Sequence, residues 1–517
     1  MKMMLALVAA LAVLGAANAQ VLENECPPKS GDVYTLGYLG GLTSWRAAWL
    51  AAEHAVNGNA LAAKPSVGCF DFDITFFTGD GADLDNQWCK TGESWDDVDL
   101  PTLSDGQPLF LDGPSSGDMP TEECADVGIC FPSNVLRCDT ACTAARGEPC
   151  AEWITQTAPD VMGLVGAGCS GPTIAAANYL EELGIPLISP SATSPALSDV
   201  VEHPNFFRTC PGDAGQSKAL IDLAVSFGIQ KGAVIATRDP YSQGFAEGVV
   251  QFGPENGVDI TTFELICQDT ECEPYVDEVT AAVQSIKDTG AKAIFSTSHC
   301  KNHQLIKSIA FDLDMTSENC YMWFAGDGRT FDDCIDDLAE KGAASYPGLE
   351  TSPVPPEATL GSIGTSPRGG SGDIYVDFMG YWAEQGVCEF PSQIHNEGVL
   401  SLENYSTEAY DAVLAYAMAI KGIREAGGEV TPAAIIAELD KDDFTFQGAT
   451  GIVSFGGEFD PPIGDHDRPP VYDIKVYEGS WITVGYWSPV DLEAVNIFMP
   501  LIFPTATLDP PACLQEP

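Results

Sequence analysis

Short apolar segments alternate with amphipathic segments along most of this chain, and this alternation limits the fold more than any other feature. Residues 33–39 and 72–77 have the length and composition of strands, and residues 45–56 between them have the apolar period of a helix. The same alternation runs from residue 161 to residue 325. Strands that alternate with helices form mainly parallel sheets covered by helices, so we predict an α/β fold. Further predicted helices cover 173–183, 216–227, 244–252, 276–287, 304–311 and 410–426; further strands cover 161–165, 186–189, 232–236, 260–265, 293–296, 321–325, 451–455, 472–477 and 481–486.

Two stretches interrupt this alternation. Residues 79–150 are acidic and rich in glycine, proline and cysteine, and we expect them to form an insertion. Residues 345–373 are dense in proline, glycine and serine, which predicts a linker or mobile loop.

The first 19 residues have the pattern of a secretory signal peptide. Lys2 precedes an apolar run, and Ala17, Asn18 and Ala19 form a small-residue cleavage site. The run is too short to span a bilayer, and no later stretch reaches the roughly 20 apolar residues that a membrane helix needs. We expect a secreted protein, extracellular or periplasmic, without a membrane span. A retained N-terminal anchor is the alternative interpretation.

The chain contains 17 cysteines, which suits an oxidising compartment where disulfides persist. Many of them cluster between residues 89 and 169, but spacing does not give their connectivity. The odd total leaves at least one thiol free or paired with another chain. The spacing of a cysteine zinc site is missing, and His299 and His303 have no acidic residue near them in the sequence. We therefore expect no metal and no cofactor, and capping or solvated roles for both histidines.

Acidic residues outnumber basic residues by 75 to 23, and the formal net charge is −52. Such a charge repels nucleic acid and anionic lipid, so neither is expected as a partner. A hydrophobic content of 45% argues against disorder. A salt-rich exterior would screen the self-repulsion. Calcium binding is not favoured, because the Asp-rich stretch 80–85 lacks the EF-hand spacing.

A glycine-rich turn at residues 166–171 follows a predicted strand and opens a helix. Ser170 lies near the helix start, and Pro172 suits the first helical turn. The unpaired N–H groups and the positive end of the helix dipole favour an anion such as a carboxylate here. The glycines also satisfy a GxGxxG dinucleotide fingerprint. We reject that interpretation, because Ile185, Pro186 and Leu187 stand where an acidic residue would bind the ribose.

From this turn onward the chain resembles a known family. It is similar to the ligand-binding domain of metabotropic glutamate receptors over the run VGAGCSGPTIAAANYLEELGIPLISPSATSPALSD and the following FFRTCPGD. YMWFAGDGRT, YDAVLAYAMAI and GIVSFGGEFD also resemble segments of that family. More broadly, the chain resembles the type I periplasmic-binding-protein superfamily, which includes bacterial branched-chain amino-acid-binding proteins. The likeness spans most of residues 31–505 and is strongest over 160–245.

The resemblance implies a two-lobed fold, each lobe a mainly parallel sheet flanked by helices, with three hinge crossovers. Lobe 1 would comprise residues 31–208 and 343–445, and lobe 2 residues 209–342 and 446–490. Residues 491–517 would form a C-terminal tail. A small molecule would bind between the lobes, at the carboxyl ends of the strands, and the lobes would close around it.

The resemblance also implies a set of amino-acid contacts. Carried over residue by residue, the family's ligand-binding residues correspond to Ser170, Ser191, Thr193, Asp213, Tyr241 and Asp327. Serine and threonine hydroxyls would hold a carboxylate, and the two aspartates and the tyrosine ring would hold an ammonium. Each residue also has a structural interpretation: Ser170 and Asp213 as helix caps, Asp327 as a turn residue and Tyr241 as packing.

The distal part of the site departs from the glutamate receptors, whose side-chain contacts there are basic. The same register places Trp45 and Ile463 at two of these positions. Without a cationic partner, burying a second carboxylate costs several kcal/mol, so we expect a neutral or apolar L-α-amino acid. A one-residue slip would bring Arg46 inward and reverse this expectation.

An enzyme is not expected, because Ser170 does not lie in a GxSxG elbow and no base is placed beside it. Two other roles stay open. The chain would act as a ligand-binding protein through a dimer or a separate membrane partner protein, or it would be a structural protein that has lost the ligand.

Overall fold

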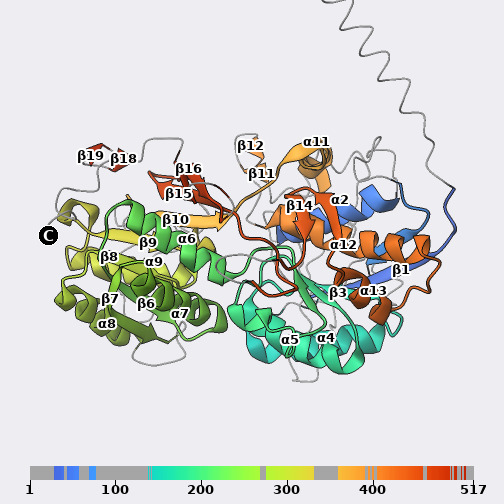
Figure 1. Ribbon diagram of the computed structural model, residues 1–517, viewed down its shortest axis with the longest axis horizontal. Helices are drawn as coiled ribbons and strands as arrows, with labels where there is room; N and C mark the ends of the chain where they lie inside the picture. The colour runs from blue at the N-terminus through green and yellow to red at the C-terminus, as the bar shows by residue number, and fades with distance from the viewer. Residues whose placement is uncertain are drawn as a thin grey trace, which may run out of the picture.

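Two lobes lie side by side along the longest axis of the computed structural model (Figure 1). The structure describes residues 28–39, 43–57, 69–76, 138, 140, 142–267, 275–330, 359–389, 394–395, 399–400, 405–457, 463–489, 491, 494–497, 502–503 and 506–507. The predicted signal peptide, most of the predicted insertion and most of the predicted tail lie outside these residues.

Lobe 1 is built on a five-stranded sheet in which all neighbouring strands are parallel. Its order is β2 (Asp73–Phe76), β1 (Val33–Tyr38), β3 (Gly163–Val165), β4 (Leu187–Ser189) and β5 (Phe206–Arg208). β3, β4 and β5 are buried at every residue, as expected for parallel strands covered on both faces. The helices of this lobe are α2 (Thr43–Asn57), α4 (Ala144–Thr157), α5 (Ser170–Leu183), α11 (Gly372–Glu389), α12 (Ser406–Glu425) and α13 (Pro432–Leu439).

Lobe 2 is built on an eight-stranded mixed sheet. The sheet is parallel from β7 to β10 and antiparallel from β10 to β17. Its order is β17 (Val495–Ile497), β16 (Trp481–Trp487), β15 (Tyr472–Tyr477), β10 (Ile363–Pro367), β9 (Met322–Ala325), β8 (Ala293–Ser296), β6 (Lys231–Thr237) and β7 (Asp259–Ile266). Its helices are α6 (Asp213–Ser226), α7 (Pro240–Glu255), α8 (Tyr275–Thr289) and α9 (Cys300–Asp312).

Each lobe has its own apolar core. In lobe 1, α12 packs against α2 and α13, and its buried Tyr416 donates hydrogen bonds to the carbonyls of Leu164 (2.8 Å) and Pro186 (2.9 Å). In lobe 2, Phe245 of α7 and Phe295 of β8 belong to one buried cluster. No helix among the described residues has the length and apolar character that a membrane span requires.

The chain passes between the sheets after β5, after β10 and after the β13 (Thr445–Gly448) to β14 (Gly451–Ser454) hairpin, which packs against α12. Two sequence-based boundaries therefore move. Residues 363–367 were expected in the 345–373 loop and in lobe 1, but they form β10 of lobe 2. The glycine and the proline of this segment have low strand propensity, so the sequence does not predict a strand there. The strand forms because it pairs with β9 on one side and β15 on the other. The third crossover follows Ser454 rather than residue 445.

Two disulfides lie at the end of the predicted insertion: Cys138–Cys150 joins two of its residues, and Cys142–Cys169 joins it to the residue that precedes α5. Cys69, Cys267 and Cys320 are also disulfide-bonded. Cys210 is buried and has a free thiol, in agreement with the odd number of cysteines.

Candidate functional site

The turn from β3 to α5 exposes backbone donors at the carboxyl edge of the lobe 1 sheet. Ser170 is the first residue of α5 and is 2% exposed. Its Oγ accepts a hydrogen bond from the Ser194 N–H at 3.1 Å, which leaves the hydroxyl hydrogen for another partner. Within the described part of the chain, the N–H groups of residues 168–171 donate to no acceptor. This turn has the donors that an anion needs at a helix N-terminus.

The loop after β4 lies directly against this turn. The Ser191 hydroxyl donates to the Gly168 carbonyl at 2.7 Å. Arg208 stabilises this loop, because its Nη1 donates to the carbonyls of Ala192 and Ser194, both at 3.0 Å. The Thr193 Oγ1 is buried and has no hydrogen-bond partner among the described residues. Thr193 therefore offers a buried hydroxyl beside the α5 N-terminus.

Asp213 begins α6 and is fully buried. Its N–H donates to the Thr193 carbonyl at 2.8 Å, but neither carboxylate oxygen has a hydrogen-bond partner in the described structure. Burial raises the pKa of Asp213 well above its usual value, and the charge of Asp327 raises it further. The Thr193 hydroxyl lies near enough to lower this pKa, although the two side chains do not meet in good hydrogen-bond geometry.

Tyr241 and Asp327 are the predicted site residues that lobe 2 contributes. The Tyr241 hydroxyl donates to Asp327 Oδ1 at 3.1 Å and accepts from the Gly328 N–H at 3.2 Å. Tyr405, which immediately precedes α12 of lobe 1, donates its hydroxyl to Asp327 Oδ2. Burial raises the pKa of Asp327, while the hydroxyls of Tyr405 and Tyr241 act to lower it. The Tyr405–Asp327 hydrogen bond joins the two lobes.

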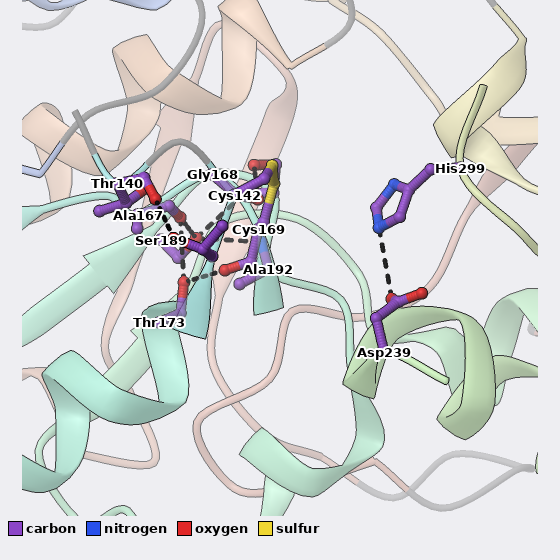
Figure 2. Close-up of a disulfide and its surroundings, with 12 residues drawn as sticks. Thr140, Cys142, Ala167, Gly168, Cys169, Thr173, Ser189, Ala192, Asp239 and His299 are labelled. Atoms are coloured by element: carbon purple, nitrogen blue, oxygen red, sulfur yellow. Dashed lines mark hydrogen bonds and ion pairs between the residues drawn. A yellow bond between two sulfur atoms is a disulfide. The ribbon is translucent and has the colours of Figure 1, made fainter. Parts of the chain in front are cut away.

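His299 lies beside the same cluster. Its ring centroid is 4.8 Å from that of Tyr241, and its Nε2 is 3.3 Å from Asp239 Oδ1 (Figure 2). Burial acts to raise the pKa of Asp239, but the hydrogen bond and charge of His299, together with hydrogen bonds from Ser242 and Thr237, outweigh burial and lower that pKa. A capping or solvated role was expected for His299. It is the N-cap residue of α9 without a side-chain capping bond and is partly exposed, and the fold brings Asp239, which is distant in the sequence, to its ring. The described residues hold no cluster of metal ligands.

Sequence comparison identifies the family of this chain. The family model described as "Receptor family ligand binding region" matches residues 134–477, which is more than half of the 517 residues. The chain belongs to the receptor ligand-binding-region family. This is a family of binding domains rather than enzymes, as expected from the sequence.

The relatives of this ligand-binding region are distant. Metabotropic glutamate receptor 6 of Oryctolagus cuniculus is 23% identical over 385 residues, which cover 65% of this chain and 42% of the receptor. Metabotropic glutamate receptor 8 of Homo sapiens is 28% identical over 174 residues, which cover 33% of this chain and 18% of the receptor. The chain thus spans less than half of the length of these receptors.

Solved structures show the same fold. The leucine binding protein LivK of Thermotoga maritima matches with a TM-score of 0.58 at 16% identity, covering 89% of this chain and 100% of that protein. An ABC transporter substrate-binding protein of Desulfitobacterium hafniense matches with a TM-score of 0.55 at 13% identity, covering 88% of this chain and 100% of that protein. These matches confirm the two-lobed periplasmic-binding-protein fold predicted from the sequence.

The fold of this ligand-binding region brings six of the predicted site residues into one connected group. Ser170, Ser191 and Thr193 come from lobe 1, Asp213 begins the helix after the first crossover, and Tyr241 and Asp327 come from lobe 2. The seventh, Trp45, lies in α2, and its side chain is outside the described structure. Sequence reasoning missed Tyr405, because no motif marks a residue that precedes a helix in a poorly patterned stretch.

Proposed function

We propose that this ligand-binding region binds the α-amino and α-carboxylate groups of a free L-amino acid between its lobes. The observation that carries the proposal is the Asp213 carboxylate, which is 0% exposed and has no hydrogen-bond partner within the described structure. A buried carboxylate without a partner is costly, and such groups are rare in native proteins. A ligand ammonium between Asp213 and Asp327 would supply the missing partner.

The carboxylate end of the ligand has matching groups on lobe 1. The N–H groups of residues 168–171 and the hydroxyls of Ser170 and Thr193 are donors in one small region. A carboxylate there would make charge-assisted hydrogen bonds, each contributing about 1.5–3 kcal/mol. The carboxyl groups of Asp213 and Asp327 on one side of the site and the hydrogen-bond donors on the other would fit a zwitterion in a single orientation.

The ligand side chain is proposed to be neutral or apolar. Asp213 and Asp327 already place two carboxyl groups in the cleft, and a glutamate ligand would add a third. Two buried arginines of this region are used by the protein itself: Arg208 pairs with Asp467 at 2.7 Å, and Arg468 donates to the Thr209 and Thr450 carbonyls. Burying an apolar side chain such as leucine would contribute about 1.5–3 kcal/mol. The glutamate in the names of the receptor relatives would require a cation in addition to these two.

The proposed site of action is outside the cell or in the periplasm. The disulfides support an oxidising compartment, and the export-signal pattern of residues 1–19 supports secretion. Binding would favour lobe closure, because the ligand contacts both lobes only when they are together. A dimer contact or a membrane partner protein would then respond to the closed shape.

A thermal-shift panel of the twenty L-amino acids tests this proposal. A ligand at about a hundred times its dissociation constant adds about 2.7 kcal/mol of stability. We expect the largest shift with an apolar amino acid and a clearly smaller shift for that ligand in the Asp213→Asn variant. The largest shift with glutamate would contradict the side-chain class alone. No shift with any amino acid, together with no small molecule released on denaturation, would contradict the proposed function.

A further inference from the structure

The first turn of α5 is held by a segment that ends the predicted insertion. Residues 142–157 contain α4, which packs along α5, and the disulfide Cys142–Cys169 joins this segment to the N-cap residue of α5 (Figure 2). Cys169 immediately precedes Ser170. A covalent link therefore meets the chain next to the donors of the ligand site.

Close packing supports the same attachment. A Cβ atom at Gly147 of α4 would lie 2.1 Å from the Pro172 carbonyl oxygen, so only glycine lets α4 come this near to the first turn of α5. On the neighbouring turn, a Cβ at Gly171 would lie 3.5 Å from the Ala144 Cβ. The two helices are therefore in direct contact at the start of α5.

The carbonyl groups of this turn are also fixed. Ala167 O accepts from the hydroxyls of Ser189 (2.7 Å) and Thr173 (3.2 Å), and Cys169 O accepts from the Thr173 hydroxyl at 2.8 Å. Gly168 O accepts from the Ser191 hydroxyl. In a planar trans peptide the N–H points opposite to the preceding C=O. Each bonded carbonyl therefore fixes the direction of the N–H group that follows it, at residues 168, 169 and 170.

We propose that the Cys142–Cys169 disulfide is a positioning group of the ligand site. It fixes residue 169 to the α4 segment, so that the hydroxyl bonds keep the turn in one conformation and its N–H groups stay aimed at the ligand carboxylate. The inference rests on the proposed function, because it assigns the disulfide a part in the same carboxylate site. It also gives the end of the insertion a role in binding.

The test compares two disulfide deletions in the full chain. Cys142→Ala/Cys169→Ser removes the proposed positioning bond, and serine at position 169 is a good N-cap, so the helix start is not weakened. Cys138→Ala/Cys150→Ser removes the other disulfide of the α4 region, which joins no residue of α5 or its N-cap, and is the matched control. The readouts are the dissociation constant for L-leucine by calorimetry and amide hydrogen exchange of α5 without ligand.

We expect the dissociation constant of Cys142→Ala/Cys169→Ser to rise about tenfold, the equivalent of one charge-assisted hydrogen bond, with faster exchange at the first turn of α5. The control should lose stability but keep its affinity and its α5 exchange. Equal losses of affinity in both variants, or unchanged α5 exchange in the first, would overturn the inference.

Failure of the proposed function gives a different result. If the wild-type protein binds neither L-leucine nor any other amino acid, the proposed function is contradicted. The amide hydrogen exchange of α5 in the two disulfide variants then tests only whether the Cys142–Cys169 disulfide fixes the start of α5. If Cys142→Ala/Cys169→Ser does not fold, Gly147→Ala disturbs the same contact without removing a thiol. It should also weaken L-leucine binding and speed α5 exchange, and wild-type values in both would overturn the inference.

Discussion

Buried carboxyl groups are the main feature of this protein at the scale of single residues. Asp213, Asp327 and Glu408 are all at most 4% exposed, and burial raises the pKa of each. Their partners differ. Asp327 accepts two tyrosine hydroxyls, Glu408 accepts the Thr407 hydroxyl at 2.9 Å, and Asp213 has no bonded partner within the described structure. The group that the protein leaves unsatisfied is the one we assign to the ligand ammonium.

Asp213→Asn should separate binding from folding. The amide keeps the shape but loses the negative charge, so ligand binding should weaken by about 1.5–3 kcal/mol. The free energy of unfolding should stay the same or rise, because a buried carboxyl group without a partner in the described structure is replaced by an amide that cannot ionise. Calorimetric titration and urea unfolding measure the two quantities. Glu181→Gln, an exposed change on α5, is the control, and unchanged affinity in Asp213→Asn would mean that the register carried over from the family is wrong.

Glu408 should contribute to the pH dependence of stability, together with Glu53 and Asp411, because burial raises the pKa of Glu53 to about 7 and that of Asp411 to about 6. Burial raises the pKa of Glu408 to about 7, although the Arg468 charge acts to lower it. Because the folded state then binds more protons than the unfolded state, the free energy of unfolding falls as the pH rises from the usual glutamate value through about 7. Asp213 acts in the same direction. Asp239 acts oppositely, but only at more acidic pH, since its pKa is lowered.

Urea unfolding without ligand at about pH 6 and about pH 8 measures this slope. We expect higher stability at about pH 6, and a smaller difference in Glu408→Gln, which cannot ionise. Equal slopes in wild type and variant would show that Glu408 is not the titrating group.

At the scale of elements, the sequence predicted the segments with a strong apolar period and missed those without one. β15 was predicted at its observed bounds, 472–477. α5 and α6 begin at Ser170 and Asp213, one turn earlier than predicted, because their first turns contain small and polar residues instead of apolar ones. β10 was missed, because its strand character comes from its two neighbours in the sheet.

The positions of the candidate site residues were predictable to the same degree, and their role in ligand binding stays a prediction. The resemblance supplied residue types and positions, and the fold brings six of them together. The resemblance did not supply Tyr405. This residue contacts Asp327, which is 78 residues away in the sequence and lies in the other lobe. Nor does the sequence give the side chain of the proposed amino-acid ligand, which would depend on contacts distal to the α-amino and α-carboxylate groups.

Tyr416→Phe tests how α12 is attached to the lobe 1 sheet. The change removes the hydroxyl that donates to the carbonyls of Leu164 and Pro186, so the free energy of unfolding should fall by about 1–2 kcal/mol. Ligand affinity should not change, because Tyr416 lies in the core. Urea unfolding and calorimetric titration check both. A loss of affinity with no loss of stability would contradict this structural role.

At the scale of the whole molecule, the net charge of −52 opposes folding by self-repulsion. Added NaCl should therefore raise the melting temperature without ligand. The gain should level off near 0.5 M, where the Debye length falls to about 4 Å. A thermal melt series in NaCl measures it. A flat series, or a gain that grows steadily above that concentration, would show that the charge is not the cause.

The lobe–lobe contacts decide how open the protein is without ligand. The Tyr405 hydroxyl of lobe 1 donates to Asp327 of lobe 2, and the Ser194 hydroxyl donates to the Pro240 carbonyl at 2.9 Å. Both bonds exist only while the lobes are together. Tyr405→Phe keeps the ring and removes the first bond, so the unliganded protein should populate an open state more often.

Small-angle scattering should then give a larger radius of gyration for unliganded Tyr405→Phe than for wild type, and saturating ligand should bring the two values together. Affinity should fall by up to about 1.5–3 kcal/mol, because the ligand must offset the free energy of closing the lobes. Tyr179→Phe is the matched control, since its hydroxyl meets Thr155 within lobe 1 at 3.2 Å and joins no second lobe. An unchanged radius in Tyr405→Phe would mean that ligand and packing, not this hydroxyl, hold the lobes together.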